Sequence, residues 1–132
     1  RDGTSAAVGC YSITDGEWSQ SDVAWRIPQT IRLDSTVVRE HPTAAETWYL
    51  LRPDAQTLSS RRGGGESICQ PIGADSVWLV WAGDYEQLNA RLELRDGRMQ
   101  GVVRGSTDVM RPTERLPWAP VSGNRVPCSP EL

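Results

Sequence analysis

The feature that most constrains the fold of this chain is a strict alternation of apolar and polar residues on both sides of a tight-turn signal. From position 88 to 94 every second residue is Leu or Ala, Asp96-Gly97 follows, and Met, Gly and Val take alternate positions from 99 to 103. A period of two is typical of strands with one wet face, and Asp-Gly is a strong hairpin signal. With the β-rich run Ser76-Val-Trp-Leu-Val-Trp81, the pattern predicts a three-stranded antiparallel meander over residues 76–105.

Weaker strand signals occupy the rest of the chain. Five further segments carry β-branched, aliphatic or aromatic residues between turn residues: 8–14, 25–33, 46–52, 55–61 and 123–128. No window keeps a convincing helical period, and the best helix candidates, 43–46 and 108–115, are short. We therefore expect an all-β fold of about eight short strands, arranged as a sandwich or a barrel.

Length and charge indicate one domain that does not bind nucleic acid. The 132 residues carry a net charge of −3, whereas a nucleic-acid partner demands a basic face. No apolar run is long enough to predict a transmembrane helix. We expect a single barrel domain over residues 1–132, with a flexible arm at 1–7 and a Pro-rich tail at 110–132 that contains a short closing strand.

Residue usage suggests a source and an unusual core. The chain has no Lys and no Phe, while all 14 of its basic residues are Arg and 6 residues are Trp. Such usage is typical of a GC-rich bacterial genome. The tryptophans are expected to do part of the filling that Phe usually does in a small barrel.

The three cysteines favour an oxidising compartment. A bridge between Cys10 and Cys128 would close nearly the whole chain into a loop and would stabilise it by about 4–5 kcal/mol in the chain-entropy model. Such a bridge is typical of exported domains, so we expect a periplasmic, cell-surface or extracellular protein. Cys69 would then be free, although the sequence permits its pairing with Cys128 instead. Residues 7–10 (Ala-Val-Gly-Cys) also resemble a bacterial lipobox, in which the Cys is acylated.

Three short motifs resemble the lipocalins, a family of small up-and-down barrels. Gly16-Glu17-Trp18 matches the Gly-x-Trp at the start of a lipocalin first strand, and Thr107-Asp108-Val109 stands where the family carries Thr-Asp-Tyr. Arg125 lies late in the chain, as does the family's lone Arg. The resemblance implies an eight-stranded barrel closed by a contact between Trp18 and Arg125, with the binding of small apolar molecules as its usual role.

No set of residues in the sequence indicates an enzyme, a metal site or a cofactor. Gly-x-Ser-x-Gly is absent, the single His41 lies in a polar stretch before a proline, and the cysteines lack metal-ligand spacing. Arg61 and Arg62 precede three glycines but lack the Lys of a phosphate-binding loop. We interpret this stretch as a hairpin tip that can contact an anion or a partner.

Two functions remain open from the sequence alone. The first is an exported carrier whose aromatic-lined interior holds a small apolar ligand; its pocket candidates are Trp25, Trp48, Leu50, Leu79, Trp81, Leu92 and Met99. The second is a protein-interaction module, either an accessory subunit or a self-assembling unit, whose anchor candidates are Arg61, Arg62, Trp78 and Trp118. A large apolar interior volume would favour the carrier, and a filled interior with an exposed apolar patch would favour the module.

Overall fold

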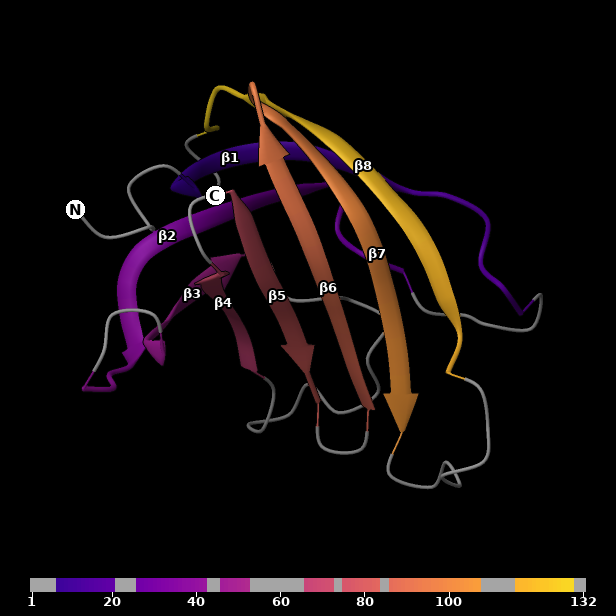
Figure 1. Ribbon diagram of the computed structural model, residues 1–132, viewed down its shortest axis with the longest axis horizontal. Coiled ribbons are helices and arrows are strands. Elements are labelled where there is room, and N and C mark those ends of the chain that lie inside the picture. Colours follow the sequence, from indigo (N-terminus) through magenta and orange to yellow (C-terminus); the bar gives the residue numbers. More distant parts are fainter. Residues whose placement is uncertain are drawn as a thin grey trace.

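The chain folds as a closed antiparallel β-barrel. The computed structural model describes residues 7–20, 26–42, 46–52, 66–72, 75–83, 86–107 and 116–129. Its strands are β1 (Gly9–Asp15), β2 (Thr30–Arg39), β3 (Trp48–Arg52), β4 (Glu66–Ile72), β5 (Ser76–Ala82), β6 (Glu86–Arg95), β7 (Arg98–Thr107) and β8 (Trp118–Val126). Each strand pairs with the next along the chain, and β8 pairs with β1. The predicted all-β, eight-stranded, up-and-down barrel is confirmed (Figure 1).

The predicted meander forms strands β5, β6 and β7. Leu79, Ala90 and Val103 stand opposite one another across the three strands, and all three side chains point into the barrel. Asp96 and Gly97 form the hairpin turn with φ angles of 53° and 78°, which are the positive values that a two-residue turn of this kind requires. Figure 1 shows the three strands side by side on the near side, with β1 and β2 crossing behind them.

The barrel closes where the first strand meets the last. Pairing between β1 and β8 runs from Cys10 opposite Val126 to Asp15 opposite Val121. Just beyond this ladder, a disulfide joins Cys10 to Cys128, with their Cα atoms 5.2 Å apart. The expected bridge is thus confirmed, and it leaves Cys69 as a free, buried thiol. Because the sulfur of Cys10 is held in this bridge, the lipobox reading of residues 7–10 is wrong for this form of the chain.

Arg125, a residue of β8, reinforces the same junction between β1 and β8. Its Nη2 group donates to the carbonyl oxygen of Val8 at 3.1 Å and to the hydroxyl of Tyr11 at 2.8 Å. The Tyr11 hydroxyl in turn donates to the carbonyl oxygen of Ala7 at 2.8 Å. The guanidinium also lies 5.3 Å from the centre of the Tyr11 ring, within the range of a cation–π contact. A covalent bond and a polar clamp therefore hold the same junction.

The contact between Trp18 and Arg125 that the lipocalin resemblance implies is not formed. Residues 16–18 follow the end of β1 rather than opening the first strand. The neighbouring Ser19 donates its backbone N–H to the carbonyl oxygen of Trp118, at the start of β8, and from there the strand runs about 23 Å to Arg125. Trp18 instead donates its Nε1–H to Asp15 at 2.9 Å. Thr107 ends β7, and Asp108 and Val109 lie outside the described residues.

Several strand boundaries differ from those expected, mainly near prolines. The strand expected at 25–33 is β2, which starts at Thr30 after Pro28, and the closing strand begins at Trp118 rather than at 123. No strand is predicted over the residues of β4, where Pro71 interrupts the pattern. Pro71 stands opposite Val77 of β5, but β3 pairs with β4 only at Ile68 and Cys69, so the β3 side of β4 is an open edge at Pro71, where proline is tolerated. The predictions at 55–61 and 108–115, and those for most of 43–46 and 1–7, concern residues outside the described ranges.

A glycine in β7 permits the close approach of two strands. A Cβ atom at Gly101 would stand 2.0 Å from the carbonyl oxygen of Arg91 and 2.9 Å from a methyl of Leu92, both on β6. Real Cβ atoms do not come this close to a backbone oxygen. Only glycine therefore fits at this inward-facing position without moving one strand away from the other.

Loss of the disulfide should weaken the barrel without changing its fold. We expect the double variant Cys10→Ser, Cys128→Ser to unfold with a free energy lower by about 4–5 kcal/mol, because its unfolded chain is no longer a closed loop. Urea unfolding followed by tryptophan fluorescence measures this difference. A reductant should destabilise the wild type by a similar amount and should leave the double variant unchanged. Equal stability of the two proteins would show that the hydrogen-bonded seam needs no covalent support.

Replacement of the β7 glycine should be costly. We expect Gly101→Ala to lower the free energy of unfolding by about 1–3 kcal/mol or more, since the added methyl overpacks against backbone. Thermal unfolding compared with Gln100→Ala, a change at the exposed neighbouring position, separates crowding from a general effect on the strand. A variant at position 101 as stable as the one at position 100 would contradict the close approach.

Candidate functional site

Four of the predicted pocket residues line the barrel interior. Leu79, Trp81, Leu92 and Met99 point inward and are at most 1% exposed. They belong to one continuous cluster of buried side chains that also includes Tyr11 from the opposite wall. These residues are brought together as expected, but they pack against one another as a core.

Side chains fill the interior over the part of the barrel that is described. Trp81 and Tyr11 are the largest fully buried side chains, and aliphatic residues from β1 to β8 surround them. Beside Cys69, Leu33 and Val77 a cavity of only about 10 Å³ remains. That is about the space of one water molecule and far below the several hundred Å³ of a pocket for an organic ligand.

The remaining pocket candidates do not line this interior. On β3 the buried residues are Tyr49 and Leu51, so Trp48 and Leu50 lie on the outer face of the barrel. Both were expected to point inward, but the alternate residues of β3 do so instead. When a strand is apolar on both faces, its sequence does not show which face is the inner one. Trp25 lies outside the described residues.

The free thiol of Cys69 is sealed inside the wall. Its Sγ donates to the carbonyl oxygen of Leu50 at 3.7 Å. Burial, together with the nearby charge of Asp34, raises the pKa of Cys69 from 9.0 to about 12. A protonated and inaccessible thiol is neither a nucleophile nor a metal ligand at neutral pH.

The outer face of the barrel carries an aromatic and cationic stack. Trp78 and Trp81 lie on opposite faces of β5, as their spacing predicts. The Trp78 ring packs against Trp48, with ring centres 5.0 Å apart and planes inclined by 58°, and the Arg91 guanidinium sits 4.7 Å from the Trp78 ring centre. The Nε1–H of Trp78 is buried without an acceptor. Although Trp78 points away from the core, its ring is covered by Trp48 on one side and by Arg91 on the other.

Strand register extends this stack into a patch across β5 to β8. Trp78 stands opposite Arg91, Arg91 opposite Val102 and Val102 opposite Pro120, while Arg104 stands opposite Trp118 in the adjacent row. Trp118 is 45% exposed. We call this surface the outer patch; it consists of Trp78, Arg91, Val102, Arg104, Trp118 and Pro120.

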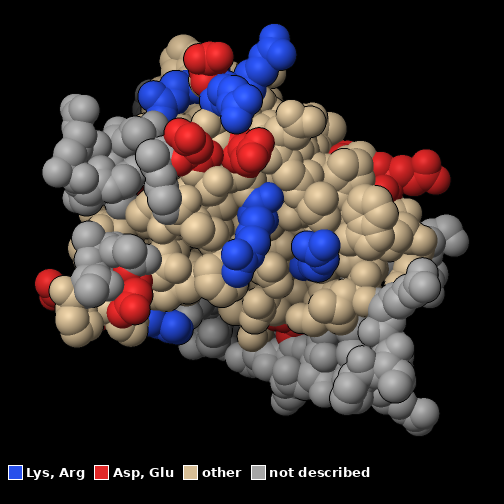
Figure 2. Space-filling view, viewed as in Figure 1, with Lys and Arg blue, Asp and Glu red and all other residues tan. Residues whose placement is uncertain are grey.

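The charge of the outer patch is purely basic. No described carboxylate forms an ion pair with Arg91 or Arg104. Figure 2 shows this side of the molecule: basic side chains stand among mostly uncharged side chains in the middle of the view, with acidic groups close above them. The interaction candidates Trp78 and Trp118 therefore lie on one surface, whereas Arg61 and Arg62 fall outside the described residues.

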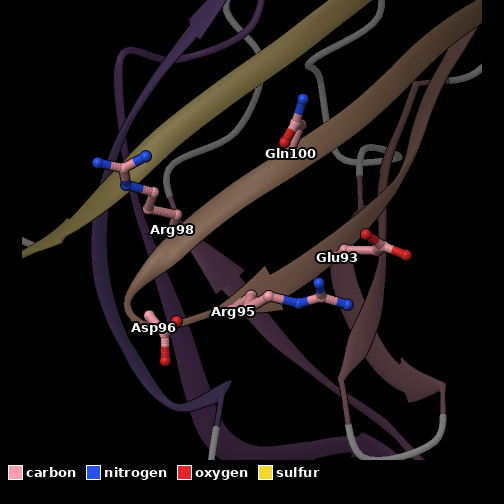
Figure 3. Close-up of a pocket in the computed structure, with 5 residues that line it drawn as sticks. All are labelled: Glu93, Arg95, Asp96, Arg98 and Gln100. Carbon is pink, nitrogen blue, oxygen red and sulfur yellow. The ribbon is translucent and has the colours of Figure 1, made fainter.

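A polar groove at the β6–β7 hairpin is less suited to binding. It encloses about 520 Å³ and is lined by Glu93, Arg95, Asp96, Arg98 and Gln100. Figure 3 shows these side chains pointing in different directions rather than toward a common point. Because specific ligand sites hold convergent polar groups, this groove is a solvated strand end.

The described residues contain no cluster of metal-ligating side chains and no helix with the length and apolarity needed to cross a bilayer. His41 is exposed, and its backbone N–H donates to the Thr47 hydroxyl at 3.3 Å. Comparison with protein-family models, with curated proteins and with solved structures finds no match for this chain.

The buried thiol gives a pH dependence with a definite sign. Above about pH 9 the unfolded chain loses the Cys69 proton, while the folded chain keeps it up to about pH 12. We therefore expect the free energy of unfolding to fall as the pH rises through this window, by up to about 1.4 kcal/mol per pH unit. Urea unfolding of the wild type and of Cys69→Ala at several pH values measures the difference. A difference that does not change with pH would contradict a sealed thiol.

Proposed function

We propose that this chain is an exported, non-enzymatic module that binds another protein through the outside of its barrel. The proposal is carried by one observation, the division of roles between the two faces of the barrel wall. Over the described residues the inner face is a packed core, and the cavity beside Cys69 measures only about 10 Å³. The outer face presents Trp118 and two arginines without carboxylate partners among the described residues.

The composition of the outer patch supports protein binding. Tryptophan and arginine are the residues most enriched among the side chains that contribute most to protein interfaces. Trp118 supplies a large apolar surface that is already exposed, and the stack of Trp48, Trp78 and Arg91 is formed before any partner arrives. Preformed side chains lose little conformational freedom on binding, which favours affinity.

The disulfide supports an exported location. A bridge such as that between Cys10 and Cys128 persists in the periplasm, at the cell surface or outside the cell, and is rare in reducing compartments. The absence of an enzymatic role is part of the proposal. The thiol of Cys69 faces the core and His41 is exposed on a different part of the chain, so the described residues offer no paired nucleophile and base.

Site-specific photo-crosslinking tests the proposal. With the variant Trp118→p-benzoylphenylalanine produced in the chain's natural host, we expect a discrete cross-linked protein adduct. The matched control is Ser12→p-benzoylphenylalanine, since Ser12 is also exposed but lies on β1, outside the outer patch. We expect at least a severalfold weaker adduct there, because benzophenone reacts only with groups held against it.

Native mass spectrometry of the chain from the same host distinguishes the interaction module from the carrier. A free chain at its polypeptide mass, together with a larger assembly, supports the module. A stoichiometric small apolar molecule on the chain, with equal cross-linking at positions 12 and 118, would overturn the proposal and would restore the carrier.

A further inference from the structure

The outer patch holds two neighbouring positive charges, and one carboxylate, that of Glu93, lies two residues along β6 from Arg91 on the same exposed face. Arg91 stands opposite Val102, and Arg104 stands opposite Asn89, so the two arginines are diagonal neighbours on β6 and β7. Their Cβ atoms are about 7–8 Å apart in this arrangement. Both are exposed, and neither is paired with a described carboxylate. In a chain with a net charge of −3, this local excess of positive charge favours an anionic partner.

The geometry of Arg91 leaves its donors available. The guanidinium lies 4.7 Å from the centre of the Trp78 ring. A planar guanidinium that rests on an aromatic ring still has its N–H groups in its own plane, where they can hold a carboxylate in a bidentate manner. The contact with Trp78 thus orients Arg91 without using its hydrogen-bonding capacity.

Apolar groups flank the two charges. Val102 lies between Arg91 and Pro120 in one row, and Trp118 stands directly opposite Arg104 in the other. Val102 is half-buried, whereas Pro120 and Trp118 are exposed. The partner that fits this surface therefore combines carboxylates with an aliphatic or aromatic side chain, in contrast to the purely polar partner that two arginines alone would select.

We infer that the outer patch binds an extended acidic segment of a partner protein, with carboxylates on alternate residues and an apolar residue beside them. An extended strand places residues i and i+2 on one face about 6.6 Å apart, which matches the separation of Arg91 and Arg104. The neighbouring apolar residue then lies against Trp118. This inference rests on the proposed function and adds the chemistry of the partner.

A random-peptide display library selected on the wild-type barrel at low salt tests the inference. We expect enrichment of peptides with Asp or Glu at alternate positions next to Leu, Phe or Trp. A synthetic peptide of the enriched sequence and its Asn/Gln counterpart are then titrated by calorimetry. The acidic form should bind about tenfold more tightly, because each of two charge pairs at an exposed site raises the affinity a few-fold.

Charge-matched variants locate the site. We expect the double variant Arg91→Gln, Arg104→Gln to weaken binding of the acidic peptide about tenfold and Trp118→Ala to weaken it as well. The double variant Arg95→Gln, Arg98→Gln makes the same charge change at the hairpin and should alter affinity less than about twofold. Arg104→Gln alone removes no described contact, so its effect cannot be attributed to unfolding.

Each other outcome identifies a different error. Enriched apolar peptides that require Trp118 but ignore the arginines would overturn the acidic chemistry and leave the proposed function standing. Acidic peptides that bind equally well to both arginine pairs would overturn the inference by showing general electrostatic attraction. Self-association in sedimentation experiments that Arg104→Gln abolishes would show that a second copy occupies the patch, which also overturns the inference.

Discussion

The architecture depends on the closure of one seam, where β8 returns to β1. Without that pairing, both strands would expose an open edge, and the side chains inside the wall would be exposed to water. The seam is made from elements at opposite ends of the sequence, so it carries the largest loop-closure cost of any strand pair. The Cys10–Cys128 bridge removes much of that cost from the folding equilibrium, and Arg125 holds Tyr11 and Val8 across the same junction.

Closure of a barrel this small determines what each face of its wall can do. Eight strands enclose a space that side chains just fill, and here Trp81 and Tyr11 fill the role that Phe takes in other cores. The glycine at position 101 lets two strands approach closely, which narrows the interior further. The recognition that we propose therefore uses the outer face, where the register of the strands places Trp78, Arg91 and Trp118.

The sequence was sufficient where local signals agreed with one another. In residues 76–105 the alternation, the Asp96-Gly97 turn and the strand spacing all predicted the same meander, and all proved correct. Prediction failed where the deciding contact was remote. The parity of Trp48 depends on how β3 pairs with β2 and β4, and Pro71 lies in β4 beyond the point where the β3 ladder ends. The outer patch depends on the register of four strands. The sequence alone therefore indicated Trp78 and Trp118 as interaction candidates, but it did not show that they lie beside Arg91 and Arg104.

The position of the disulfide also has a mechanical consequence. Cys10 lies near the start of β1 and Cys128 lies just beyond the end of β8, with their Cα atoms 5.2 Å apart. When the chain before Cys10 and the chain after Cys128 are pulled apart, the tension passes directly through the disulfide. The chain between the two cysteines is shielded from that load, and only the contacts of residues that precede Cys10, such as the pairing of Gly9 with Leu33 and the hydrogen bond from Arg125 to Val8, are pulled upon. A barrel bridged in this way can be held under force at both ends while the outer patch keeps its shape.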